Sequence, residues 1–187
     1  YIFGGSGMND LRKYDITGNS WSLQSSASPV ARNAHTTVLY GTKMYVFGGH
    51  TGTSGLNDLW EYDLTTFIWT QRTSGATARW AHSAVINAGK MYVFGGQTPT
   101  YLNDLWECDI TTFTWTQKTS GATARVQHSA VVNAGKMYIF SGQGCPNDLW
   151  ECNLTTFTWT QKTSGATARI LASAVVNADK MYVFGGH

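Results

Sequence analysis

The chain has 187 residues, of which 42% are hydrophobic and 13% aromatic, so it is long and apolar enough to bury the core of one domain. Its formal net charge is only +2, and 13% of its residues are charged. This composition lacks the basic stripe that phosphate contacts require, so we expect no nucleic-acid partner. No apolar run approaches the roughly 18 residues of a membrane span, so we expect no membrane partner either.

The sequence repeats itself with a period of about 46 residues, which decides the expected architecture. The N-terminal run YIFGG returns as MYVFGG or MYIFSG, beginning at Met44, Met91, Met137 and Met181. The fifteen residues that begin at Thr111 recur unchanged from Thr155. We therefore divide the single domain, residues 1–187, into repeats of about 1–43, 44–90, 91–136 and 137–180, with the start of another at 181–187.

Each full repeat contains four short predicted strands, named A to D in chain order. Between His128 and Lys162 they are 128–134, 136–140, 148–152 and 157–162, rich in β-branched and aromatic residues and bounded by turn residues. The whole chain supplies strands B, C and D, then three sets of A to D, then A and B, which makes 17 strands. Strand B is apolar throughout, as expected when both faces are packed. The pattern predicts an all-β propeller of four-stranded antiparallel blades.

The repeated residues also resemble a known motif. A double glycine follows strand B, a Tyr or Cys precedes Asp in strand C, a Trp lies about six residues later, and Ala-Arg-x-x-His precedes strand A. This pattern resembles the kelch repeat over essentially the whole chain, and it implies a kelch-type β-propeller. Arg12, Ser141 and Ala172 depart from the motif, at its strand C Trp, first glycine and strand A His.

Most repeated residues are expected to be structural. Gly48 and Gly49 would permit a positive φ or the close approach of a neighbour. The aspartates Asp15, Asp63 and Asp109 precede Thr-Thr or Thr-Gly and predict Asx-type turns. Seven of the eight Trp fall on repeat positions and are interpreted as core between blades.

Two further repeated sets could in principle carry chemistry. The histidines His35, His82 and His128 begin strand A in successive repeats. Rotation about the axis would hold them too far apart to meet at one metal ion, whose ligands lie within about 2 Å, so we expect no metal and no cofactor. The arginines are interpreted as donors that fix the loops: Arg32, Arg79, Arg125 and Arg169.

The copies differ mainly after the double glycine and after the Ala-Arg pair. The B–C loop and the D–A connection should open on the same rim, so we expect variation to be confined to that rim, where a rigid scaffold displays functional loops. In proteins that the chain resembles, these positions line the ligand face. Our candidate contact residues are His50, Trp80, Gln97, Tyr101, Val126, Gln127, Gln143, Ile170 and Leu171, with Asn33 as a weaker member.

Trp80 leads this set because it lies off the repeat pattern and Trp is enriched at binding hot spots. The competing interpretation is that Trp80 packs over its own blade, and Tyr101 has the same ambiguity.

The sequence predicts a non-catalytic scaffold that binds a protein or peptide through this rim. One alternative is an enzyme or sugar-binding propeller, because some relatives of the fold are copper or iron enzymes or act on sugars; it would need convergent metal ligands or paired carboxylates on the rim. Another is a structural protein. The last strand B duplicates the first, so either the chain is a fragment of a propeller of perhaps six or seven blades, or its terminal strands pair with another chain.

The cysteines favour no compartment clearly. Cys108 and Cys152 occupy the strand position of Tyr14 and Tyr62 and are interpreted as small core residues, and a bridge between Cys152 and the loop residue Cys145 stays open. Asn153-Leu154-Thr155 is a glycosylation sequon. The Thr- and Ser-rich, charge-poor composition leans toward an extracellular setting, but the compartment remains unknown.

Overall fold

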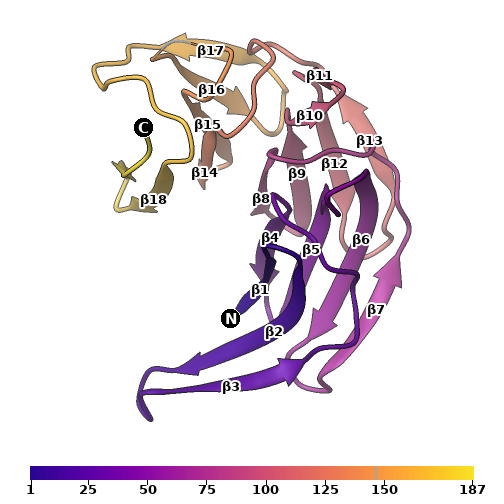
Figure 1. Ribbon diagram of the computed structural model, residues 1–187. Helices are drawn as coiled ribbons and strands as arrows, with labels where there is room; N and C mark the ends of the chain where they lie inside the picture. Colours follow the sequence, from indigo (N-terminus) through magenta and orange to yellow (C-terminus); the bar gives the residue numbers. More distant parts are fainter. Residues whose placement is uncertain (146) are drawn as a thin grey trace.

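A computed structural model describes residues 1–145 and 147–187 as antiparallel sheets that fan along an open arc (Figure 1). The first blade has the strands β1 (Ile2–Gly5), β2 (Met8–Asp15) and β3 (Ser20–Ser25). The second has β4 (Thr36–Tyr40), β5 (Lys43–His50), β6 (Gly55–Asp63) and β7 (Ile68–Arg72). The third has β8 (Ser83–Asn87), β9 (Lys90–Phe94), β12 (Leu105–Asp109) and β13 (Trp115–Lys118).

The fourth blade has the strands β14 (Ser129–Asn133), β15 (Lys136–Phe140), β16 (Leu149–Asn153) and β17 (Trp159–Lys162). A last pair, β18 (Ser173–Asn177) and β19 (Lys180–Phe184), begins the next blade. The strands β4, β8, β14 and β18 face the concave side of the arc and pack on one another in turn, whereas β7, β13 and β17 follow its convex side (Figure 1).

The 17 blade strands expected from the repeat are all present in the described part of the chain, in the predicted order. One feature was not predicted. The third blade's B–C loop folds into its own two-stranded hairpin, β10 (Gln97–Thr98) and β11 (Thr100–Tyr101), because Pro99 supplies the turn between them. Across the described residues, no helix is long and apolar enough to cross a membrane.

The hydrophobic core lies between the blades rather than within one. Phe47 of β5 packs on Trp115 of the third blade, with ring centroids 4.9 Å apart, and Phe94 of β9 packs on Trp159 of the fourth, at 5.2 Å. The indole of Trp115 also donates its Nε1–H to the carbonyl of Thr73 at 2.9 Å. The third and fourth blades are thus each joined to the preceding one by a Trp that both packs and hydrogen-bonds, and Trp69 of the second blade packs on Phe3 of the first, as expected of core between blades. Trp21 of the first blade does not fit this expectation, because it is 53% exposed.

The double glycine fits the contact between blades. Gly48 has φ +62°, and a Cβ there would lie 2.7 Å from the carbonyl oxygen of Arg79 in the next blade. Gly49 has φ +101° and donates its N–H to that same carbonyl at 2.9 Å. Glycine meets both conditions without strain, whereas Ser141, at the position equivalent to Gly48, holds a side chain at φ +53°.

The turns and the cysteines also follow the sequence. The carboxylate of Asp63 accepts the backbone N–H groups of Thr65 and Thr66 at 2.8 and 3.1 Å, which forms the expected Asx-type turn. Cys108 and Cys152 are buried in the core, and all three cysteines are free thiols. The bridge between Cys145 and Cys152 left open by the sequence is therefore not formed.

Candidate functional site

The variable rim is held by a buried arginine at the entrance to each complete blade. Arg79 is fully buried and donates from Nη1 and Nη2 to the two carboxylate oxygens of Asp104, both at 2.7 Å. It also donates from Nη1 to the carbonyl of Gly95 at 3.0 Å. The same arrangement joins Arg32 to Asp58 and Arg125 to Asp148. The arginine thus ties the D–A connection to the B–C loop, as expected of a loop-fixing donor.

The aspartate of this pair was not among the residues singled out by the sequence, although it is part of the repeated Asn-Asp-Leu. Its second oxygen also accepts the indole N–H of the Trp two residues later. The distance from Trp106 Nε1 to Asp104 Oδ2 is 2.6 Å. Burial raises the pKa of Asp104, but the bonds and charge of Arg79 and the bond from Trp106 outweigh it, so this pKa lies below its usual value. The carboxylate is ionised and its charge is balanced.

Main-chain bonds bring the two variable segments side by side. Isolated antiparallel bridges join Asn33 to His50, Trp80 to Gln97 and Val126 to Gln143. In the second of these, Trp80 N–H donates to the Gln97 carbonyl at 3.1 Å, and Gln97 N–H donates to the Trp80 carbonyl at 2.9 Å. The B–C loop and the D–A connection therefore share one rim, as predicted.

Trp80 packs across a blade boundary, not over its own blade. Its indole lies against the His50 ring of the second blade, with centroids 4.8 Å apart. It also covers Gly55, where a Cβ would lie 2.9 Å from the indole ring. The indole remains half-buried, so part of it faces solvent beside His50.

Tyr101, in the B–C hairpin of the third blade, contacts the fourth blade. It is exposed, and its ring lies against Gly144 of the fourth blade, where a Cβ would approach within 3.0 Å. Gln97 is half-buried beside it and Gln143 is exposed. Both aromatic members of the candidate set therefore lie at a boundary between neighbouring blades.

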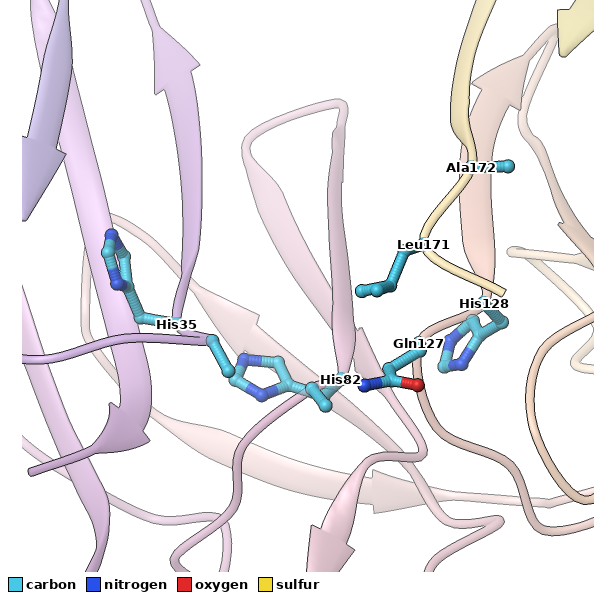
Figure 2. Close-up of a pocket in the computed structure, with 8 residues that line it drawn as sticks. His35, His82, Gln127, His128, Leu171 and Ala172 are labelled. Carbon is cyan, nitrogen blue, oxygen red and sulfur yellow. The ribbon is translucent and has the colours of Figure 1, made fainter. Parts of the chain in front are cut away.

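A pocket of about 270 Å³ opens near the axis, lined by the residues that follow each lead-in arginine (Figure 2). Figure 2 shows Gln127 and Leu171 extending toward the middle of this pocket, where the two preceding blades carry Ala34 and Ala81. All four residues have a positive φ, between +50° and +58°. This conformation is uncommon for residues other than Gly, Asn and Asp, so the rim keeps a strained backbone at the positions that line the pocket.

A ladder of main-chain bonds between blades fixes this strained backbone. Ala81 N–H donates to the Ala34 carbonyl at 2.8 Å, and Gln127 N–H donates to the Ala81 carbonyl at 2.9 Å. Leu171 N–H continues the series to the Gln127 carbonyl at 3.0 Å. The variable side chains therefore project from a backbone whose hydrogen bonds do not involve those side chains.

Two expectations for the rim are corrected. Val126 is only 2% exposed, because this apolar residue is packed into the interior where Trp80 and Asn33 stay accessible, so it cannot contact a partner directly. Variation is also not confined to this rim, since Tyr40 lies on the opposite one, in the A–B turn where the later copies have Asn. Ile170 is half-buried and Leu171 exposed, and both remain accessible.

The variable rim carries almost no charge. The B–C segments 50–57, 97–103 and 143–147 contain no Asp, Glu, Lys or Arg. The aspartate that follows each segment is neutralised by its buried arginine. Contacts on this rim are therefore made by aromatic rings, amides, hydroxyls and aliphatic side chains.

The histidines of the strand A lead-in bond to their neighbouring blades. His82 Nε2 lies 2.8 Å from Thr36 Oγ1, and His128 Nε2 lies 2.8 Å from Ser83 Oγ. No group of three or more His, Cys, Asp or Glu residues is placed to hold a metal ion within the portion of the chain that the structure describes.

Comparisons with known proteins agree with this geometry. The structure of YjhT superposes on this chain with a TM-score of 0.84, covering 98% of this chain and 68% of YjhT, at 15% sequence identity. Similarity at that identity shows the shared fold. A search of curated protein sequences finds no significant match. The family model of the Attractin/LZTR1 β-propeller matches residues 1–187, and the chain therefore belongs to this family of kelch-type β-propellers.

Proposed function

We propose that this chain is a non-catalytic binding module that recognises a protein or peptide partner through its variable rim. The observation that carries the proposal is the half-exposed indole of Trp80, which stacks on His50 at a blade boundary and is anchored by its bridge to Gln97. A rigid, partly buried aromatic side chain next to an axial pocket is the arrangement found at binding hot spots. Kelch-type propellers commonly act as scaffolds for protein interactions, which supports this function.

The chemistry of the rim defines the partner segment. Because the B–C segments contain no charged residue and Arg32, Arg79 and Arg125 are each paired with an aspartate, an uncharged segment with apolar and amide groups fits this part of the rim best. Electrostatic steering then contributes little, so the affinity should change little with ionic strength. Catalysis is not part of this proposal, because the carboxylates next to the rim are each committed to an arginine.

A peptide selection tests the proposal. The chain is immobilised, peptides are selected from a random displayed library, and dissociation constants are measured for the synthetic peptides. Trp80→Ala should weaken binding by about tenfold or more, equivalent to about 1.4 kcal/mol, because it removes the aromatic anchor. Thr112→Ala, an exposed substitution in a C–D turn on the opposite rim, is the matched control and should leave the affinity unchanged.

The same variants separate loss of binding from loss of structure. Trp80→Ala should lower the melting temperature much less than Trp115→Ala, which opens a cavity between blades and costs about 3–5 kcal/mol. Selected peptides that bind wild type and Trp80→Ala equally would refute recognition through this rim. So would peptides whose binding is abolished by Thr112→Ala.

A further inference from the structure

The opposite rim contains a cavity of about 510 Å³ between the second and third blades. It lies where the β4–β5 turn of one blade meets the β12–β13 turn of the next. We call it the junction cavity and define it by Tyr40, Lys43, Glu61, Arg72, Ile110 and Phe113. It is separate from the variable rim, and its argument does not depend on the function proposed for that rim.

Two cations and one carboxylate meet inside the junction cavity. Glu61, with only 4% of its side chain exposed, accepts from Lys43 Nζ at 2.6 Å and from Arg72 Nη2 at 2.9 Å. Burial raises the pKa of Glu61, but the bonds from Arg72 and Lys43 outweigh it, so this pKa lies below its usual value and the group is ionised. The cluster therefore keeps one net positive charge.

The guanidinium of Arg72 has donors to spare. Only its Nη2 bonds to Glu61, and its buried Nε has no acceptor among the residues that the structure describes. The group lies over the Phe113 ring, with its central carbon 4.6 Å from the ring centroid. An oriented, planar guanidinium is matched to the two oxygens of a carboxylate.

The residues of this cavity that depart from the repeat pattern carry the argument. At the next junction, the equivalents of Arg72 and Tyr40 are Lys118 and Asn87, around Glu107. That junction satisfies its glutamate with two lysines, at 2.8 and 3.2 Å, and its cavity is smaller, at about 300 Å³. Balancing the buried glutamate therefore requires neither the arginine nor the tyrosine.

The turn that supplies Phe113 is also strained. Phe113 has φ +56°, whereas the first blade places Asn19, a residue that tolerates this region, at the equivalent position. Phe67 and Phe157 have the same conformation at the equivalent positions, so the strained Phe belongs to the repeat, and in the junction cavity its ring supports the guanidinium of Arg72.

We infer that the junction cavity binds a small planar carboxylate, gripped by Arg72 and Lys43 and lying against the rings of Tyr40 and Phe113. Tyr40 is 46% exposed, so its ring forms an open wall of the cavity. The net positive charge selects an anion, and the two rings select a flat ligand over a compact one such as chloride.

Titration with benzoate, followed by NMR of the ¹⁵N-labelled chain, tests this inference. Benzamide is the uncharged control, and the ionic strength is held constant. The Arg72 Nε–H resonance should move and saturate at millimolar benzoate, with little response to benzamide. The backbone amides of Gly41 and Thr111 line the same cavity and report binding in every variant.

Variants taken from the second junction make the test specific. Arg72→Lys and Tyr40→Asn each introduce the residue type that the second junction has at the equivalent position, and each should weaken benzoate binding severalfold. Lys118→Gln, which alters only the second junction, should leave the affinity unchanged. Equal shifts with benzamide, shifts that do not saturate, or unchanged affinity in either of the folded variants Arg72→Lys and Tyr40→Asn would overturn the inference. Because the two variants change different elements, either one that folds decides the outcome.

Discussion

The histidines at the start of the innermost strands have pKa values that are lowered by burial between neighbouring blades. Burial and the nearby charge of Arg125 lower the pKa of His128 to about 3. Burial, with the charge of Arg79, also places the pKa of His82 well below its usual value. Both rings are thus neutral in the folded chain, and each bonds through Nε2 to a hydroxyl of the preceding blade.

These histidines predict loss of stability in weak acid. In the unfolded chain they titrate near pH 6.5, whereas the folded chain does not take up the protons, so lowering the pH favours unfolding. Between about pH 7.5 and about pH 5.5, each of His82 and His128 should lower the free energy of unfolding by about 1.4 kcal/mol. Urea denaturation at the two pH values measures this change. His35, whose pKa is lowered to about 4 by burial and the charge of Arg32, should contribute a similar loss. His128→Gln should therefore remove about a third of the total change, and an unchanged pH dependence in that variant would contradict the assignment.

At the scale of elements, a buried arginine joins the loop before strand A to the loop before strand C. The Arg79–Asp104 pair spans 25 residues of sequence and fixes both loops at once. Its aspartate is 17% exposed and its arginine fully buried, so breaking the pair strands a positive charge in the interior.

Asp104→Asn should therefore destabilise the chain by about 3–5 kcal/mol, measured by chemical denaturation. Asp10 occupies the same repeat position but pairs with the exposed Arg12, so Asp10→Asn should cost less than about 1 kcal/mol. Equal losses for the two substitutions would show that the buried pair has no special role in stability.

At the scale of the whole molecule, the contact of a Trp side chain with the neighbouring blade contributes to the stability of the arc. A Cβ on Gly121 would lie 2.3 Å from Trp159 of the next blade, whereas one on Gly165 would meet nothing within 4 Å. The two glycines occupy the same place in identical segments of sequence.

Gly121→Ala should therefore destabilise the chain by at least about 1–3 kcal/mol, because the methyl group displaces the indole. Gly165→Ala should be neutral or stabilise it by up to about 1 kcal/mol, through reduced entropy of the unfolded chain. Differential scanning calorimetry of both variants checks the pair. Similar melting temperatures would mean that the contact between blades yields without cost.

The repeat made the blades, the glycine pair and the Asx turns predictable, because each is determined by residues close together in sequence. The partner of Arg79 was not predictable from the sequence. Asp104 lies 25 residues further along the chain, and the two meet only because strands A and B bring the B–C loop back beside the D–A connection. The burial of Val126 and the β10–β11 hairpin also depend on how two loops meet. Tyr40 did leave a signal, because it replaces the Asn of the later A–B turns, but only the structure shows that it faces Arg72 across a cavity.

The ladder that runs from Ala34 through Ala81 and Gln127 to Leu171 uses only main-chain atoms. Its side chains can therefore be exchanged without rebuilding the scaffold, provided that the new residue accepts a left-handed backbone. That condition favours Gly, Asn and Asp and penalises Val, Ile and Thr. The binding specificity of this surface can thus be changed by single substitutions to a limited set of residue types, while the backbone beneath it keeps its conformation.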